Sequence, residues 1–132
     1  MQARHADYVV LVVADLDRAL AFYVDVLGLP LAHRSGPFAQ LATGATRISL
    51  YERAAMAETL GRPLVAPSPD APGFELGFLV DDCDGAYEEL VAAGAEAAVP
   101  ATDRAWGQRT AYVRDPDGHL VELAQDIRGQ PE

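Results

Sequence analysis

The amino-acid sequence contains the same unit twice, and this repeat constrains the fold more than any single motif does. Residues 13–23 (VADLDRALAFY) and residues 80–90 (VDDCDGAYEEL) share one pattern, with Asp15 and Asp82 at equivalent places 67 positions apart. In each copy an apolar strand leads into a helix that begins at the aspartate, whose carboxylate can cap free backbone N–H groups. A repeated unit leaves an apolar face that only its partner can cover. We therefore expect the two copies to form one body with a site between them.

Composition and charge limit the classes of partner. The chain has 132 residues, half of them hydrophobic, which fits a single domain over 1–132 with a real core. Its 20 acidic and 10 basic residues give a net charge of −10, which disfavours binding to nucleic acid or to anionic lipid. The apolar run at 8–14 is too short to span a bilayer, and residues 1–7 lack a signal-peptide pattern. We expect a cytoplasmic protein with a small-molecule partner, no nucleic acid and no membrane.

Hydrophobic periodicity predicts the element order βαβββ in each copy. The first module covers 7–53 and the second covers 74–126, and the proline-rich linker at 54–73 includes one short helix. A helix follows the capping aspartate in each module and ends at a glycine, Gly28 or Gly94. The strands are expected at 8–13, 29–34, 38–43, 47–52, 75–80, 95–100, 108–114 and 119–125.

Two single residues need a separate interpretation. Cys83 is the only cysteine, so an internal disulfide and a thiolate zinc cluster are both excluded, and we expect the side chain to pack inertly. Residues 115–118 (DPDG) predict a hairpin turn between the last two strands. His119 follows this turn, and we expect it to be exposed or to cap the turn.

Two separated motifs resemble those of a known family. Residues 15–23 (DLDRALAFY), with Gly28 closing the helix, and residues 115–123 (DPDGHLVEL) together resemble the vicinal oxygen chelate superfamily. That superfamily includes glyoxalase I, extradiol dioxygenases, fosfomycin-resistance transferases and bleomycin-type resistance proteins. The resemblance implies an α+β fold, in which two βαβββ modules form a cup-shaped, eight-stranded mixed sheet with the helices on its outer face. It is less specific for function, because one fold hosts many activities.

The resemblance also implies where metal-using members would hold an ion. Their four ligand positions fall on Tyr8, Ser49, Glu75 and Glu122, and none of the three histidines falls on one of them. A divalent metal usually needs three imidazole or carboxylate ligands, whereas this chain offers two carboxylates. We therefore expect a pocket without a metal or other cofactor. The alternative is a lyase, isomerase or dioxygenase in which Glu75 and Glu122 hold a divalent ion such as Zn, Mn, Fe or Ni.

Two carboxylates facing one cavity allow more than one role. Glu75 and Glu122 could bind a cationic or hydroxyl-rich ligand, or one of them could act as a general base with a raised pKa. The structural alternative makes Glu122 a hydrogen-bond partner and leaves Glu75 at an open rim.

Strand alternation extends the set of side chains expected inside the cup. Its aromatic walls suit a flat, conjugated molecule. We expect a homodimeric binding protein, with swapped or side-by-side modules, that sequesters a bulky aromatic or cationic compound such as an antibiotic and is not an enzyme. A further alternative is a non-catalytic module that contributes a surface to a larger complex. The expected ligand-binding residues are Tyr8, Phe38, Gln40, Arg47, Ser49, Tyr51, Glu75, Trp106, Tyr112 and Glu122.

Overall fold

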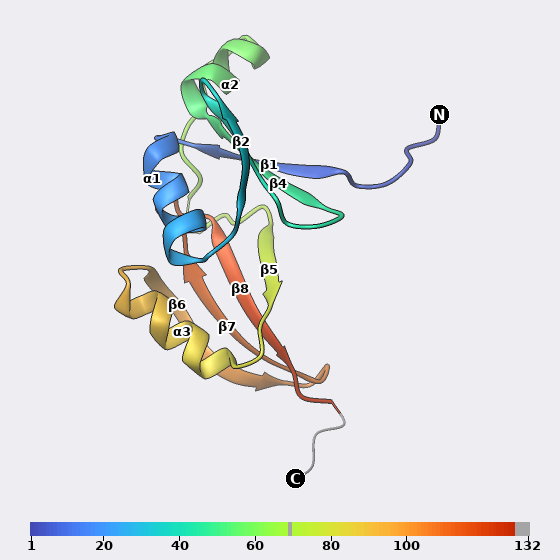
Figure 1. Ribbon diagram of the computed structural model, residues 1–132, viewed down its shortest axis with the longest axis vertical. Coiled ribbons are helices and arrows are strands. Elements are labelled where there is room, and N and C mark those ends of the chain that lie inside the picture. The colour runs from blue at the N-terminus through green and yellow to red at the C-terminus, as the bar shows by residue number, and fades with distance from the viewer. Residues whose placement is uncertain (69, 129–132) are drawn as a thin grey trace. The chain divides into compact units, whose positions relative to one another are not determined.

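The computed structural model describes residues 1–68 and 70–128 (Figure 1). The chain forms two compact units, and the boundary between them in the sequence lies between Ala66 and Pro67. The division falls within the predicted linker, of which Pro69 lies outside the described residues. The first unit contains β1 (Tyr8–Val13), α1 (Leu16–Leu20), η1 (Ala21–Val26), β2 (Leu31–Ser35), β3 (Phe38–Leu41), β4 (Arg47–Glu52) and α2 (Arg53–Leu60). The second contains β5 (Glu75–Leu79), α3 (Cys83–Ala92), β6 (Glu96–Arg104), β7 (Gln108–Arg114) and β8 (Leu120–Asp126).

Each unit has one four-stranded mixed sheet with the same topology. The strand order is β1-β4-β3-β2 in the first sheet and β5-β8-β7-β6 in the second. The first and last strands of each module pair in parallel, and the other neighbours pair antiparallel. The predicted α+β class, with two βαβββ modules, is confirmed. That the two sheets close into one cup stays a prediction.

The capping aspartates explain why the two modules start alike. The Asp15 carboxylate accepts a hydrogen bond from the Arg18 backbone N–H at 3.1 Å, and Asp82 accepts one from Gly85 at the same distance. Both caps satisfy donors that the first helical turn leaves free. Gly28, in the chain after η1, has a φ of 83°, a left-handed value that glycine adopts without steric cost.

The first helix differs from the expected continuous α-helix. From Ala21 it has π geometry, and the Leu27 N–H donates to the carbonyl of Phe22, five residues earlier, at 2.8 Å. The neighbouring side chains Phe22 and Tyr23 are both buried, with their rings edge to face at 4.9 Å. The wider π turn therefore accompanies the burial of two adjacent aromatic rings, which periodicity alone does not reveal.

Two further differences concern the second unit. Strand β6 continues four residues past Pro100, where the sequence pattern ended it. The proline is accommodated because β6 is an edge strand and its register against β7 shifts on either side of Val99. His119 is buried, not exposed as one of the two expectations had it, and its ring lies 5.9 Å from that of Phe74.

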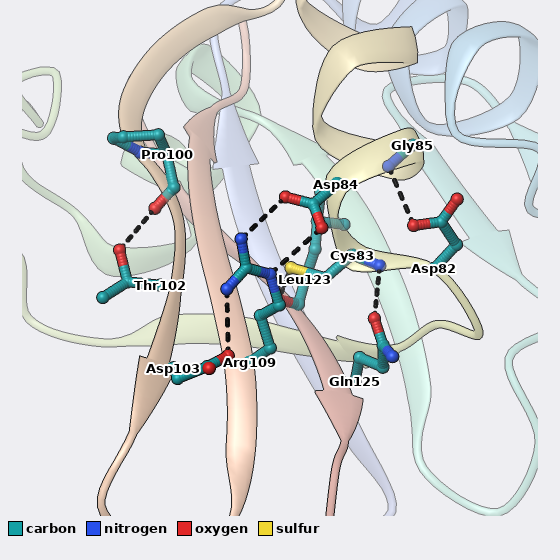
Figure 2. Close-up of polar contacts among 10 residues, drawn as sticks. All are labelled: Asp82, Cys83, Asp84, Gly85, Pro100, Thr102, Asp103, Arg109, Leu123 and Gln125. Carbon is teal, nitrogen blue, oxygen red and sulfur yellow. Dashed lines mark hydrogen bonds and ion pairs between the residues drawn. The ribbon is translucent and has the colours of Figure 1, made fainter. Parts of the chain in front are cut away.

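Polar contacts hold α3 onto its sheet (Figure 2). Arg109 of β7 donates to both carboxylate oxygens of Asp84 in the first turn of α3, at 3.1 and 2.9 Å, and to Asp103 of β6 at 2.9 Å. The hydrogen bond from Arg109 lowers the pKa of the Asp84 carboxyl. Cys83 is fully buried beside these groups, and burial raises the pKa of its thiol, in keeping with the predicted packing role. Among the described residues no helix is long and apolar enough to cross a membrane.

Candidate ligand-binding site

A hollow of about 390 Å³ lies on the first sheet. The core-facing residues of β1 and β4, such as Leu11 and Leu50, are fully buried, and the residues that alternate with them face the hollow. Six of the ten predicted binding residues meet here, although their role in binding stays a prediction. The lining consists of Tyr8, Val10, Phe38, Gln40, Arg47, Ser49, Tyr51 and Met56. Met56 comes from α2. The sequence pattern predicted this helix but did not indicate which strand it packs against.

Aromatic rings form one wall of this hollow. Phe38 of β3 and Tyr51 of β4 are direct neighbours across the sheet, and their ring centroids are 6.2 Å apart in an edge-to-face arrangement. The Tyr51 hydroxyl lies 3.2 Å from the Thr59 hydroxyl on α2, which holds the ring in place. Tyr8 lies at the other end, with 57% of the residue exposed. A fixed ring pair beside an exposed ring can hold a flat molecule by offset stacking.

The positive charge at the hollow is already paired. The Arg47 guanidinium donates to the carboxylate of Asp7, the residue that precedes β1. The Arg47 backbone N–H also donates to the carbonyl of Asp7, at 3.0 Å. Arg47 therefore contributes mainly an aliphatic stem and hydrogen bonds to the lining, because its charge is balanced.

The second sheet carries a different hollow, of about 530 Å³. Two of the predicted residues, Glu75 and Tyr112, lie in it. The Tyr112 hydroxyl donates to Oε2 of Glu122 at 2.6 Å, so Glu122 acts as a hydrogen-bond partner, the structural alternative considered from sequence. Burial, and to a smaller extent the charge of Glu122, raise the pKa of Glu75. The full lining consists of Glu75, Ala97, Ala98, Val99, Tyr112, Arg114 and Leu120.

Trp106 is placed apart from both of these hollows. It lies in the turn before β7 with 55% of the residue exposed, and its indole Nε1 donates to Oε1 of Gln108 at 3.0 Å. The Gln108 amide in turn donates to Asp126 on β8 at 3.0 Å. These bonds fix the ring at one end of the second sheet, and a ligand contact there stays a prediction.

The residues at the family's ligand positions do not fit a divalent metal. Among the described residues, no group of three His, Cys, Asp or Glu side chains gathers as a metal site. The first unit offers only the phenol of Tyr8 and the hydroxyl of Ser49, which are poor ligands for such an ion. In the second unit, one carboxylate oxygen of Glu122 is occupied by the Tyr112 hydroxyl.

Comparison with known proteins decides the family. The model of the Glyoxalase/Bleomycin resistance protein/Dioxygenase superfamily matches residues 5–123. The chain belongs to this superfamily. The resemblance inferred from the two sequence motifs is thereby confirmed.

Individual relatives within the superfamily cover most of the chain. It is 35% identical over 117 residues to the uncharacterized protein YraH of Bacillus subtilis, which covers 86% of this chain and 91% of that protein. It is 29% identical over 126 residues to the bleomycin resistance protein of Geobacillus stearothermophilus, covering 88% and 92%. A crystal structure of a glyoxalase/bleomycin resistance protein/dioxygenase from Nocardioides matches with a TM-score of 0.79 and 27% identity, covering 98% and 87%.

The raised pKa of Glu75 predicts a pH-dependent effect of removing its charge. Ionising Glu75 costs stability in the folded state, and this cost is absent below the ordinary pKa of 4.5 and grows as the pH rises through the raised value. We expect Glu75→Gln to raise the thermal midpoint at about pH 7 by a small amount, on the order of 1–2 °C, because the group is largely exposed. At about pH 4 we expect no change. Thermal unfolding followed by circular dichroism measures both.

Glu58→Gln is the matched control for this substitution, because Glu58 is an exposed glutamate on α2 in the other unit. The Glu58→Gln substitution should change the thermal midpoint by the same small amount at both pH values. An equal rise for Glu75→Gln at both pH values would mean that the effect does not come from ionisation.

Proposed function

We propose that this protein binds a bulky aromatic or cationic small molecule, such as an antibiotic, and sequesters it without chemical change. The observation that carries the proposal is the hollow of about 390 Å³ on the first sheet, with its aromatic walls and few polar groups. Small-molecule sites are typically concave, about 300–1,000 Å³ in volume, and mostly apolar with a small number of polar groups. A relative named bleomycin resistance protein supports the same kind of ligand.

Size and charge refine the class of ligand. A hollow at the lower end of that range accommodates a few fused rings, and a larger substituent would extend past the exposed Tyr8. The net charge of −10 favours the approach of a cationic molecule. Because Arg47 is paired with Asp7, its charge does not oppose a cation. A flat ring system that carries a positive charge therefore matches both the size of the hollow and the negative net charge of the protein.

We further propose that the protein acts as a homodimer, as the family resemblance implies. Sedimentation velocity at micromolar concentration should give about twice the mass of the chain, 14.1 kDa. A species of single-chain mass at all concentrations would oppose this part of the proposal.

A metal-free site is also part of the proposal, supported by the donor set described above. We expect protein purified without chelator to contain less than about a tenth of a divalent metal ion per chain, measured by elemental analysis. A stoichiometric metal content that Glu122→Gln abolishes would instead favour a metal-dependent lyase, isomerase or dioxygenase.

The aromatic wall should determine affinity. We expect Phe38→Ala to weaken binding of acridine orange, a flat tricyclic cation, by about 10- to 100-fold, because a buried ring contact is worth about 1.5–3 kcal/mol. Fluorescence titration measures the dissociation constant. Phe74→Ala is the matched control, since Phe74 lies in the second unit against His119 and is 47% exposed. It should leave the affinity unchanged.

The choice of probes lets the proposal fail. Wild-type protein should bind at least one of acridine orange, daunorubicin and bleomycin with a dissociation constant below about 100 μM, a modest affinity for a pocket of this size. Binding of none of them would overturn the proposal, and so would an unchanged affinity in the Phe38→Ala variant.

A further inference from the structure

The two modules place equivalent residues at equivalent points of their sheets. In the parallel pairs, Val10 lies opposite Ser49, and Gly77 lies opposite Glu122. Val10 and Gly77 are separated by 67 positions, the offset of the repeat, so Ser49 and Glu122 are equivalent. On the next strand of each sheet, Gln40 pairs with Ser49 and Tyr112 pairs with Glu122. The repeat thus supplies an internal comparison between a Gln40–Ser49 pair and a Tyr112–Glu122 pair.

The two pairs differ in how their polar atoms are satisfied. In the second unit the Tyr112 hydroxyl donates to Glu122 at 2.6 Å, so the pair is closed within the protein. In the first unit Ser49 is 0% exposed, and its Oγ has no hydrogen-bond partner in residues 1–68 and 70–128. A buried hydroxyl without a partner destabilises a folded protein, because its hydration is lost and not replaced. Ser49 also lines the hollow of the proposed site.

Ser49 belongs to a row of polar side chains across the first sheet. Gln40 of β3 pairs with Ser49 on one side and with His33 of β2 on the other, so all three lie on the same face. The Phe38 and Tyr51 pair flanks this row, and the His33 ring lies 5.8 Å from that of Phe38. The hydroxyl and the amide can each donate and accept a hydrogen bond, and neither carries a charge. Such a row recognises a neutral polar edge, and the adjacent rings recognise a flat face.

We propose that Ser49, together with Gln40, selects aromatic ligands that carry carbonyl or hydroxyl oxygens along one edge. This inference rests on the proposed function and names the class of ligand for the same hollow. The ligand oxygen supplies the partner that Ser49 lacks in the free protein, while the rings of Phe38 and Tyr51 cover the flat face. A flat molecule without edge oxygens fills the same space but leaves Ser49 unpaired. The row of polar side chains therefore adds nothing to the affinity for such a molecule.

Two probes of similar charge separate these contributions. Daunorubicin has a flat ring system with carbonyl and hydroxyl oxygens along its edges and carries one positive charge on an attached amino sugar. Acridine orange is a flat cation without oxygen atoms. We expect Ser49→Ala to weaken daunorubicin binding by about 5- to 10-fold, the effect of one hydrogen bond, and to change acridine orange binding by less than about twofold. Fluorescence titrations of the wild type and the variant with both probes give the four dissociation constants.

Control variants keep the result interpretable. Ser35→Ala removes the hydroxyl of an exposed serine on β2 that does not line the hollow, and it should leave both affinities unchanged. Gln40→Met keeps the length of the side chain and removes the amide, so it should weaken daunorubicin binding more than acridine orange binding. This second variant also tests the row if Ser49→Ala folds poorly.

Thermal unfolding of the free protein distinguishes recognition from a structural role. Because the Ser49 hydroxyl has no partner in the described part of the chain, we expect Ser49→Ala to keep or raise the thermal midpoint even though it weakens daunorubicin binding. A lowered midpoint with equal loss of both probes would show a structural role and overturn the inference. Equal affinities of the variant and the wild type for daunorubicin would overturn it as well, while the proposed function stands. Wild-type protein that binds neither these probes nor bleomycin would overturn the proposed function, and the inference with it.

Discussion

The parallel pairing of the first and last strand of each module is the constraint on which the site depends. A parallel pair cannot be joined by a tight turn, so the chain must cross over before it returns. In the first unit this crossover contains α1, η1, β2 and β3, and it places β4 between β1 and β3. The hollow lies on that central strand and its two neighbours, which contribute side chains to one face of the sheet. Residues more than 30 positions apart, such as Tyr8 and Arg47, thereby become direct neighbours.

The two modules share this strand order, but the polar residues at equivalent positions differ. At the equivalent central positions the second unit has a carboxylate that accepts a hydrogen bond from a phenol hydroxyl, and the first unit has a serine hydroxyl without a partner among the described residues. The second hollow is larger and its lining includes a glutamate, whereas the lining of the first has three aromatic rings and no carboxylate. The polar pair in the second unit is therefore closed within the protein, whereas the serine of the first unit is the group that we propose a ligand pairs with.

Much of the fold could be predicted because its signals are local. The β-branched residues of Tyr8–Val13 and the capping aspartates act over a few positions, and both predictions agree with the structure. Once Ser49 was assigned to the face of β4 that lines the hollow, the alternation of side chains along a strand predicted Arg47 and Tyr51 on the same face, and all three line the hollow. The prediction for β4 needed the period of a strand and one position that the family resemblance supplied.

The parts that were missed depend on contacts between distant segments. The π geometry from Ala21 accompanies the burial of two adjacent rings, and the continuation of β6 past Pro100 depends on its position at the edge of the sheet. Met56 reaches the hollow only because α2 folds back beside β4, which no local pattern encodes. Trp106 is held by hydrogen bonds to Gln108 and onward to β8, and its ligand contact stays a prediction.

The serine at position 49 is explained better by the proposed ligand binding than by the stability of the fold. Its neighbours on β4, Ile48 and Leu50, are buried and apolar, and burial of such side chains stabilises a strand. An alanine or valine at position 49 would also be buried there, without a polar atom to satisfy. A serine at a fully buried position, facing a hollow with aromatic walls, reduces the stability of the free protein. A bound molecule that supplies the missing partner recovers this loss, so the same hydroxyl that weakens the empty site favours its occupied state.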